Sequence, residues 1–455
     1  MNDELIKSLG NQLRGALLKA GDAEFESARA VYNAMHDKHP SLIVQASDVA
    51  DVVATVNFTR EQGGLLAIRG GGHSVPGYGT CNDGVVLDLG KMNSVYVNPA
   101  AKIVRAEGGC TLGDLDHASH AYGLAVPGGT VSTTGLAGLT LGGGMGHLSR
   151  SCGLSCDNLI SADVVTAAGE IITCDKNRHP DLFWAIRGGG GNFGVVTSFK
   201  FQAHPVATVF GGPTFFRLNE SVMRNYQALL AKIPRQLNAL LAMVLAPPAP
   251  FVPESWHNKP VIAVLTAWSG PENEDQRILD AVSDMGEVVG QALWRMPYPE
   301  INTFFDELLP HGLRHYWKAN AFMEFSDEAI SAHLEHGAKV ANPESGYFCF
   351  PIDGACHDVS PEDTAFANRH TNFSGVIAGT WHEEKDDTAY TGWVRDYYTA
   401  LKPSSESGAY VNFMAEDDED QVDENYGPKL QRLKEIKRIY DPDNLFRVNM
   451  NIRPD

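Results

Sequence analysis

Three clusters of glycine are the clearest chemical signal in this sequence, at residues 70–72, 142–146 and 188–191. Glycine lets backbone N–H groups come close to an anion and readily adopts positive φ, so such clusters suit the pyrophosphate of a dinucleotide. One cluster alone is usually no more than a tight turn. Three clusters in a short part of the chain, two of them directly after apolar strand-like segments, favour a nucleotide site.

His73 directly follows the first glycine cluster, just beyond the apolar residues 65–69. A single histidine most often has only a structural role. Beside a bound flavin, however, a neutral imidazole nitrogen is a competent nucleophile toward the electrophilic 8-methyl position of the ring. His73 is therefore a candidate for covalent attachment of a cofactor.

Two common nucleotide-binding motifs do not account for these glycines. Gly189, Gly191 and Gly194 match the spacing GxGxxG, but strand-like residues 195–201 follow them, whereas that motif places a helix under the pyrophosphate. The sequence also contains no GxxxxGK[ST]. A Rossmann domain built on this motif and a P-loop nucleotidase are both unsupported.

The composition limits the class of protein. With 455 residues, 43% of them hydrophobic, the chain is too long for one core, and two domains are expected. Its 36 basic and 56 acidic residues give a net charge of −20, which disfavours nucleic acid and anionic membranes as partners. No apolar run is long enough to span a bilayer, and the seven scattered cysteines do not suggest a disulfide framework, so we expect a cytoplasmic protein.

The elements that must position the glycines fall into three stretches. Up to about Val206, helix-like residues 47–61 and strand-like residues 65–69, 85–89 and 103–109 alternate with glycine-rich turns. From there to about residue 400, apolar strand-like runs alternate with amphipathic helical stretches, which predicts a sheet covered by helices. A final stretch begins with the tetrapeptide YVNF and contains one more predicted helix.

Several segments together resemble the flavin domain of berberine-bridge-enzyme-like oxidases, which belong to the vanillyl-alcohol-oxidase class of FAD enzymes. The C-terminal YDPDNLFRVNMNI resembles the closing signature of that family, and the bacterial branch that includes 6-hydroxynicotine oxidase is most similar. The segments that carry the resemblance are RGGGHS at 69–74, VVLDL at 85–89, and the longer stretches 126–150, 153–167 and 181–199.

The resemblance implies an α+β architecture, with a two-domain PCMH-type FAD-binding fold. Residues 1–206 would form the FAD-binding domain. Residues 207–400 would form the substrate domain, an antiparallel sheet covered by helices. Residues 401–455 would return to the FAD domain.

The resemblance also implies how FAD is held. His73 stands where the family carries the histidine bonded to the flavin 8α-carbon. Val131 stands where many members have a cysteine bonded to flavin C6, so we expect a single covalent attachment. Gly129 matches a position thought to gate oxygen, where a small residue goes with oxidase activity.

Further cofactor contacts are implied for three groups of residues. The expected pyrophosphate contacts come from the residues around the first glycine cluster, the adenine and ribityl contacts from the middle of the FAD domain, and the ring contacts from its end and the C-terminal stretch. In that order they are Arg69, Gly70, Gly71, Gly72, His73 and Ser74; Gly138, Gly142, Gly143, Gly144, His147, Asn158 and Val165; and Val196, Tyr410, Asn412, Asn449 and Asn451.

Candidates for the catalytic base are less well defined. Tyr410 is expected in a strand that faces the flavin, where a tyrosine of lowered pKa could accept the substrate's proton. By strand alternation Tyr316 and Lys318 share one face, and with Glu324 they could line the substrate pocket. Ordinary packing or surface roles remain the alternative for these residues, and an amine that binds as the neutral base would need no strong protein base.

The activity expected from this pattern is oxidation of a small organic substrate by FAD, with dioxygen as acceptor and hydrogen peroxide as product. The substrate could be an amine, an alcohol or sugar, or a secondary metabolite. A flavin dehydrogenase with another acceptor and a non-catalytic ligand-binding protein are the alternatives. No metal site is predicted, and a monomer and a homodimer are both open.

Overall fold

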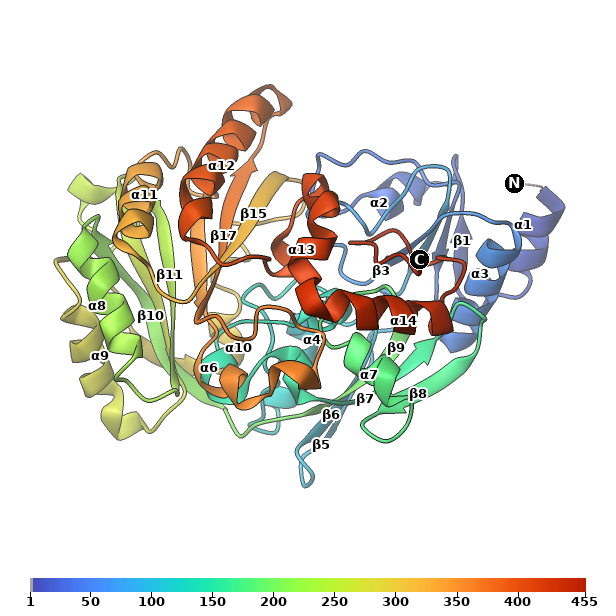
Figure 1. Ribbon diagram of the computed structural model, residues 1–455, viewed down its shortest axis with the longest axis horizontal. Coiled ribbons are helices and arrows are strands. Elements are labelled where there is room, and N and C mark those ends of the chain that lie inside the picture. The colour runs from blue at the N-terminus through green and yellow to red at the C-terminus, as the bar shows by residue number, and fades with distance from the viewer. Residues whose placement is uncertain (1–2) are drawn as a thin grey trace.

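The computed structural model describes residues 3–455, which form two halves with the C-terminal segment lying between them (Figure 1). The first half contains two sheets, and the second half contains one large sheet with helices on its outer side. This arrangement confirms the expected α+β class. The first two residues of the expected domain 1–206 lie outside the described residues.

The first sheet has four strands in the order β1-β2-β4-β3, with β2, β4 and β3 parallel and β1 antiparallel to β2. The strand β3 ends at Arg69, so the first glycine cluster leaves the sheet at a strand end. The strands of this sheet are β1 (Ala16–Leu18), β2 (Leu42–Gln45), β3 (Leu66–Arg69) and β4 (Val85–Asp88).

The second sheet has five antiparallel strands in the order β5-β6-β9-β7-β8. Its central strand β9 is the segment that follows the GxGxxG spacing, and its strand conformation confirms that this spacing does not open a helix. The strands are β5 (Val95–Asn98), β6 (Ile103–Glu107), β7 (Leu159–Val165), β8 (Ile171–Asp175) and β9 (Val195–Gln202).

Short helices connect the strands of the first half, and several begin at side-chain caps. The Asp48 carboxylate accepts from the N–H groups of Ala50 and Asp51 at the start of α3, and Thr111 forms a capping box with Asp114 at the start of α4. The helices are α1 (Asp3–Gly10), α2 (Phe25–Arg29), α3 (Val49–Glu61), α4 (Leu112–His120), α5 (Leu136–Gly142), α6 (Ser149–Cys152) and α7 (Pro180–Ala185).

The large sheet of the second half is antiparallel, with β13-β10-β12-β11-β16-β17-β15 in order and β14 paired to β10. It begins at Thr208, so the boundary expected near Val206 falls in the connection from β9. The strands are β10 (Thr208–Arg217), β11 (Leu237–Leu245), β12 (Pro260–Trp268), β13 (Val288–Gln291), β14 (Trp294–Pro297), β15 (Arg314–Phe322), β16 (Gly346–Pro351) and β17 (Phe373–Trp381).

Helices cover one face of this sheet, because alternate strand residues such as Leu241, Tyr347 and Ile377 pack against apolar helix side chains. The opposite alternate residues belong to a separate apolar cluster that faces the first half. The covering helices are α8 (Glu220–Leu230), α9 (Asp275–Ser283), α11 (Asp327–Gly337) and α12 (Asp387–Leu401), and the short α10 (Tyr298–Ile301) lies beside α4.

The C-terminal segment returns to the first half after α12 (Figure 1). It contains α13 (Val422–Tyr426) and α14 (Leu430–Tyr440), and α14 packs against α7. The buried Lys437 ammonium pairs with Asp441 at 2.7 Å and donates to the carbonyl oxygen of Asn192 at 2.7 Å. The hydrogen bond to Asn192 connects the end of the chain to the first half. Among the described helices, none has the length and apolar character needed to cross a bilayer.

Candidate functional site

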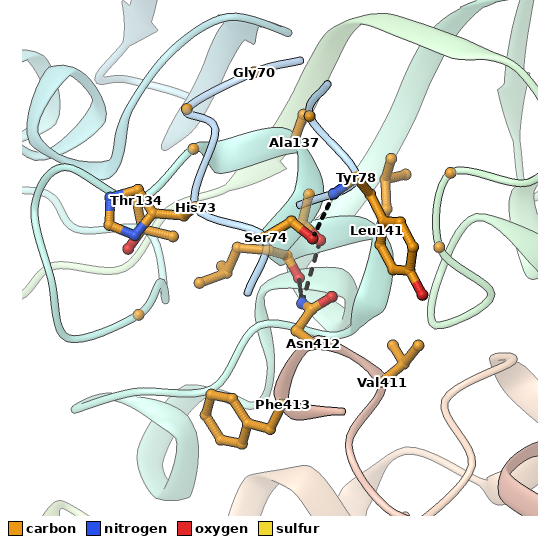
Figure 2. A pocket seen from close by; sticks show the side chains of 18 of the residues that line it. Gly70, His73, Ser74, Tyr78, Thr134, Ala137, Leu141, Val411, Asn412 and Phe413 are labelled. Atoms are coloured by element: carbon orange, nitrogen blue, oxygen red, sulfur yellow. Dashed lines mark hydrogen bonds between the residues drawn. The ribbon is translucent and has the colours of Figure 1, made fainter. Parts of the chain in front are cut away.

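A cavity of about 340 Å³ lies between the two halves, and residues of both halves and of the C-terminal segment line it. Figure 2 shows the glycine loop from Gly70 to Ser74 on one side and Asn412 and Phe413 of the C-terminal segment opposite. The cavity is therefore assembled from sequence segments that are far apart. It places the first glycine cluster and His73 next to side chains of the large sheet.

Backbone forms one wall of the cavity because two glycine segments approach each other closely. A Cβ atom on Gly71 would lie 2.4 Å from the backbone nitrogen of Gly135, and one on Gly135 would lie 2.3 Å from the nitrogen of Gly71. Gly72 adopts a φ of +69°, which L side chains rarely adopt. Only glycine fits these positions, and the resulting wall is open for close contact with a ligand.

His73 lies in the cavity wall at the end of this loop. Its ring stacks on Tyr32 with a centroid distance of 4.1 Å, and its Nε2 lies 2.9 Å from the Thr133 hydroxyl. Burial, together with the nearby His311, lowers the pKa of His73 to about 3. The imidazole is therefore neutral at physiological pH, which is the form that acts as a nucleophile.

Tyr410 also lines the cavity. Its backbone is extended, and it lies directly before the short turn at Val411–Phe413 and not in a strand. Its hydroxyl accepts hydrogen bonds from the Gly144 N–H at 2.9 Å and from the Asn412 amide at 2.8 Å. Burial raises its pKa well above the ordinary value for tyrosine. Tyr410 is therefore protonated at neutral pH, which corrects the expectation of a tyrosine with lowered pKa.

Two asparagines near the chain end have amide oxygens without partners among the described residues. The Oδ1 atoms of Asn449 and Asn451 are buried and accept no hydrogen bond from the described part of the chain, and Asn449 lines the cavity. Buried acceptors of this kind are costly unless a partner satisfies them. Of the two, only Asn449 is placed where a ligand in the cavity could supply the missing donor.

Three of the expected catalytic residues lie elsewhere. Tyr316 and Lys318 are on the face of β15 away from the cavity, where the Tyr316 hydroxyl donates to Asp417 at 2.7 Å and the Lys318 ammonium pairs with Asp417 and Asp418. Glu324 is exposed beyond the end of β15. The strand alternation was predicted correctly, but the side that faces the cavity carries Trp317.

Several expected cofactor contacts are also engaged within the protein. A Cβ on Gly142 would lie 2.4 Å from the Asn412 side chain, and one on Gly143 would lie 2.8 Å from the Phe366 ring, so these glycines pack behind the cavity wall. The Gly144 N–H is used by Tyr410. This second cluster supports the C-terminal segment, whereas the first cluster faces the cavity.

Four more residues lie outside the described lining of the cavity. The Asn158 amide donates to the carbonyl oxygens of Cys152 and Leu154, and His147 is buried with a pKa lowered to about 4 by desolvation. Those outside the lining are His147, Asn158, Val165 and Asn451; those within it are Arg69, Gly70, Gly71, Gly72, His73, Ser74, Gly129, Gly138, Val196, Tyr410, Asn412 and Asn449.

The chain is similar to known flavin enzymes along nearly its whole length. An FAD-linked oxidoreductase of Dictyostelium discoideum is 30% identical, with 99% of this chain and 97% of the relative covered. A model of an FAD binding domain matches residues 40–175, and a model described as berberine and berberine like matches residues 409–453. The chain belongs to the berberine-bridge-enzyme-like family of FAD-linked oxidoreductases.

Two further comparisons involve 6-hydroxynicotine oxidase, as the resemblance predicted. The (R)-6-hydroxynicotine oxidase of Paenarthrobacter nicotinovorans is 29% identical over 97% of both chains. The crystal structure of 6-hydroxy-D-nicotine oxidase from Arthrobacter nicotinovorans superposes with a TM-score of 0.86 at 26% identity, covering 97% of this chain and 98% of that one. Both belong to the same berberine-bridge-enzyme-like family.

The cavity of this berberine-bridge-enzyme-like protein fits FAD. The backbone wall around Gly71 and Gly135 allows close approach of a pyrophosphate, and the unpartnered amide oxygen of Asn449 suits an N–H donor such as that of the flavin ring. When bound, FAD supplies the acceptor for a hydride from the substrate. The residues of the chain position that cofactor and shape the space beside it.

Sequence reasoning did not assign a site role to Tyr32 or to the residues that the second half contributes to the cavity lining. They are mostly apolar and aromatic, and in the strands they occur at every second position, which is the one signal that could have identified them. They are Tyr32, Leu240, Phe305, Leu309, Trp317, Glu344, Phe348, Phe350, Val376, Ala378 and Thr380.

Proposed function

We propose that this protein is an FAD-dependent oxidase that takes a hydride from a small organic substrate and uses dioxygen as the electron acceptor, with hydrogen peroxide as product. The observation that carries the proposal is the neutral imidazole of His73, which lies in the wall of a cavity with a glycine backbone on one side and apolar side chains on the other. We further propose that His73 is bonded to the flavin 8α-carbon.

A single covalent attachment is supported by the residue at position 131. Val131 lines the cavity where a cysteine would be required for a second bond, and all seven cysteines are free thiols outside its described lining. A covalent bond at His73 alone retains the cofactor in the protein. Attachment of this kind also fits an imidazole already held in place by its stack on Tyr32.

Dioxygen as acceptor is supported by Gly129, which lines the cavity without a side chain. A Cβ there would lie 2.8 Å from Leu139, itself part of the cavity wall. Any larger residue would clash with Leu139 and take up space at the cavity wall. A glycine therefore preserves room for a small acceptor beside the cofactor.

Among the described residues that line the cavity, Glu344 carries the only carboxylate, and that carboxylate lies 3.2 Å from His382 Nε2. Tyr410 is protonated and already accepts two hydrogen bonds, so its role is to orient and to donate. A substrate that binds as a neutral amine loses its hydride without a prior deprotonation step. This chemistry favours an amine over an alcohol.

Oxygen consumption by the purified protein tests the proposal. After expression with ample riboflavin the protein should absorb near 450 nm, and a panel of amines, alcohols and sugars should contain compounds that cause uptake of oxygen with release of one peroxide per oxygen. Reduction of a dye without oxygen uptake would identify a dehydrogenase instead. A colourless protein would contradict any flavin-dependent function.

A further inference from the structure

His73 belongs to a stack of three rings that crosses from the first half of the protein to the second. The ring of Tyr32 stacks on His73 at a centroid distance of 4.1 Å and on His315 at 4.4 Å, with interplanar angles of 16° and 19°. Two rings this close to a third must lie on its opposite faces. His315 is part of β15, the edge strand of the large sheet, so a residue of the second half lies behind the ring that covers His73.

The segment that carries Tyr32 is hydrogen-bonded to both halves. On the side of the glycine loop, the Tyr32 N–H donates to the carbonyl oxygen of Gly72 at 3.1 Å, and the Asn33 amide donates to that of Val75 at 2.7 Å. On the side of β15, the Gly312 N–H donates to the carbonyl oxygen of Tyr32 at 3.1 Å. The backbone of Tyr32 is thus held on both sides.

Asn33 ties this segment directly to the residue at the far end of the stack. Its Nδ2 donates to the carbonyl oxygen of His315 at 2.9 Å, and its Oδ1 accepts from the His315 N–H at 2.9 Å. Both residues are only 1% exposed, so water does not compete for these two bonds. The paired bonds fix the backbone of His315 relative to Tyr32.

The His315 ring is buried and neutral, and the chemistry proposed above does not use it. Its Nδ1 lies 3.1 Å from the Thr380 hydroxyl, and its Nε2 has no hydrogen-bond partner among the described residues. Burial lowers the pKa of His315 to about 3, so the ring carries no charge at physiological pH. What this ring offers to its surroundings is its flat face, which lies against Tyr32.

A ring stack matters at an attachment point because the reactive lone pair of a neutral imidazole lies in the plane of its ring. Rotation about the Cβ–Cγ bond of a histidine is only weakly restricted by its own rotamers. A ring that turned would swing the lone pair away from the carbon it has to attack. Tyr32 covers one face of His73, and the Thr133 hydroxyl lies 2.9 Å from its Nε2, so these two contacts hold the ring in one orientation.

Tyr32 can hold that orientation only if its own ring is held as well. Its hydroxyl makes one long hydrogen bond, at 3.4 Å to the carbonyl oxygen of Leu309, which leaves the tilt of the ring to its neighbours. His311 meets the Tyr32 ring edge to face at 5.2 Å, and His315 covers the face opposite His73. Loss of the His315 ring would give Tyr32 room to tilt, and the imidazole of His73 would gain the same freedom.

We propose that His315 is a positioning residue for the covalent attachment of flavin at His73 and that it acts through Tyr32. This inference rests on the attachment proposed above. The new bond joins an imidazole nitrogen to the flavin 8α-carbon and replaces one N–H bond and one C–H bond; the two protons and two electrons released pass to dioxygen and give hydrogen peroxide. A ring of the second half thereby assists a reaction of the first half by holding the reacting nitrogen in line.

Intact-mass measurement on the full-length protein tests this proposal, because covalent attachment raises the mass of the chain by one FAD. Each protein is expressed with limiting riboflavin, purified, given FAD under air and sampled over time. His315→Leu fills the space without a flat ring and should slow attachment by about tenfold or more. His315→Phe keeps a flat ring and should stay within about threefold of the wild-type rate.

Asn238→Ala is the matched control for a general loosening of the two halves. Asn238 on β11 is buried and donates to the carbonyl oxygen of Gly146 at 2.9 Å, and neither residue belongs to the described cavity lining. This variant also loses a hydrogen bond between the halves, yet it should attach flavin at the wild-type rate even if it melts at a lower temperature.

Tyr32→Leu and Tyr32→Phe repeat the comparison at the middle ring, which keeps the proposal testable if the His315 variants do not fold. Tyr32→Leu should attach flavin slowly, whereas Tyr32→Phe, which keeps the stacked ring, should behave like the wild type. Equal rates for these two variants would overturn the proposal.

Equal attachment rates for folded His315→Leu and the wild type would also overturn it. An Asn238→Ala protein as slow as His315→Leu would do the same, because the effect would then come from general docking of the halves. Failure of the attachment at His73 itself has a different signature. In that case the wild type binds flavin but never gains the mass of FAD, and its colour is lost on denaturation.

Discussion

At the scale of single residues, the protonation state of His73 follows from what surrounds its ring. Tyr32 covers one face of the imidazole at 4.1 Å, and His311 meets it edge-on at 5.2 Å. A charged imidazolium would be poorly solvated in this place, so the pKa falls to about 3. The residue keeps its lone pair available across the physiological pH range, which is the property a covalent attachment point needs.

Substitution of Gly129 tests the role assigned to the space beside it. We expect Gly129→Val to slow the reoxidation of the reduced protein by air by about tenfold or more, because its side chain would clash with Leu139 and take up space at the cavity wall. Anaerobic reduction by substrate should change much less. Stopped-flow absorbance at 450 nm follows both half-reactions separately.

The control for this experiment is Gly392→Val, on α12, where a Cβ has no neighbour within 4 Å. This variant should reoxidise at the wild-type rate. Equal reoxidation rates for Gly129→Val and the wild type would remove the support that Gly129 gives to dioxygen as acceptor.

The site residues that could be predicted from the sequence are those with a distinctive local pattern. The first glycine cluster and His73 stand out because three such clusters occur in a short part of the chain, two of them directly after apolar strand-like segments, and His73 follows one of these. Trp317 was missed in favour of Tyr316 and Lys318, since alternation shows which residues share a face but not which face meets the cavity. That choice depends on distant partners such as Asp417, which pairs with Lys318 from another part of the chain.

At the scale of elements, helices α4 and α10 are joined through a buried carboxyl group. The Asn302 amide, directly after α10, donates to Asp116 of α4 at 2.7 Å. Burial raises the pKa of Asp116 to about 7. Between pH 4 and 7 the folded protein therefore binds more protons at this group than the unfolded chain does, and stability decreases as the pH rises through this window.

We expect Asp116→Asn to remove this part of the pH dependence, because the amide is neutral at every pH and can still accept from Asn302. At pH 8 the variant should melt higher than the wild type by roughly 1–3 °C, whereas at pH 5 the two should be similar. Thermal unfolding between pH 5 and 8 measures the difference. Asp284→Asn, at an exposed position, is the control.

Melting temperatures of the wild type and Asp116→Asn that run parallel across this pH range would contradict the account of Asp116.

The pairing of α4 with α10 could not be foreseen from local sequence. Asp116 and Asn302 belong to different halves, and only the packed structure makes the carboxyl group buried.

At the same scale, the positions of the strands along the sequence were predicted better than the order in which the strands pair in the sheet. Apolar runs such as β9 and β11 are evident in the sequence, because buried strands need continuous apolar residues. The sheet order is not evident, since β16 inserts between β11 and β17 while β15 takes the edge. The cavity face of the sheet depends on this order, which explains why the lining residues of this sheet were not anticipated.

At the scale of the whole molecule, the C-terminal segment joins the two halves around the cavity. Asp417 and Asp418 attach it to the large sheet by pairing with Lys318. Tyr410 accepts a hydrogen bond from the Gly144 N–H, and Asn412 donates to the carbonyl oxygen of Gly138. Lys437 donates to the carbonyl oxygen of Asn192 and so fixes the end of the segment to the FAD-binding half. Residues 410–413 consequently lie over the cavity with both ends of the segment held. A cofactor bonded to His73 would then share its cavity with the glycine backbone wall and with lining residues of the large sheet.

The central claim is tested most directly by where the yellow colour goes when the purified protein is denatured in acid. The flavin should remain with the precipitated wild-type polypeptide, and a His73-containing peptide should be heavier by one flavin. His39→Ala, at an exposed histidine, should behave in the same way, whereas His73→Ala should release its flavin into the supernatant. Release of flavin from the wild type, or its retention by the His73→Ala polypeptide, would contradict the account.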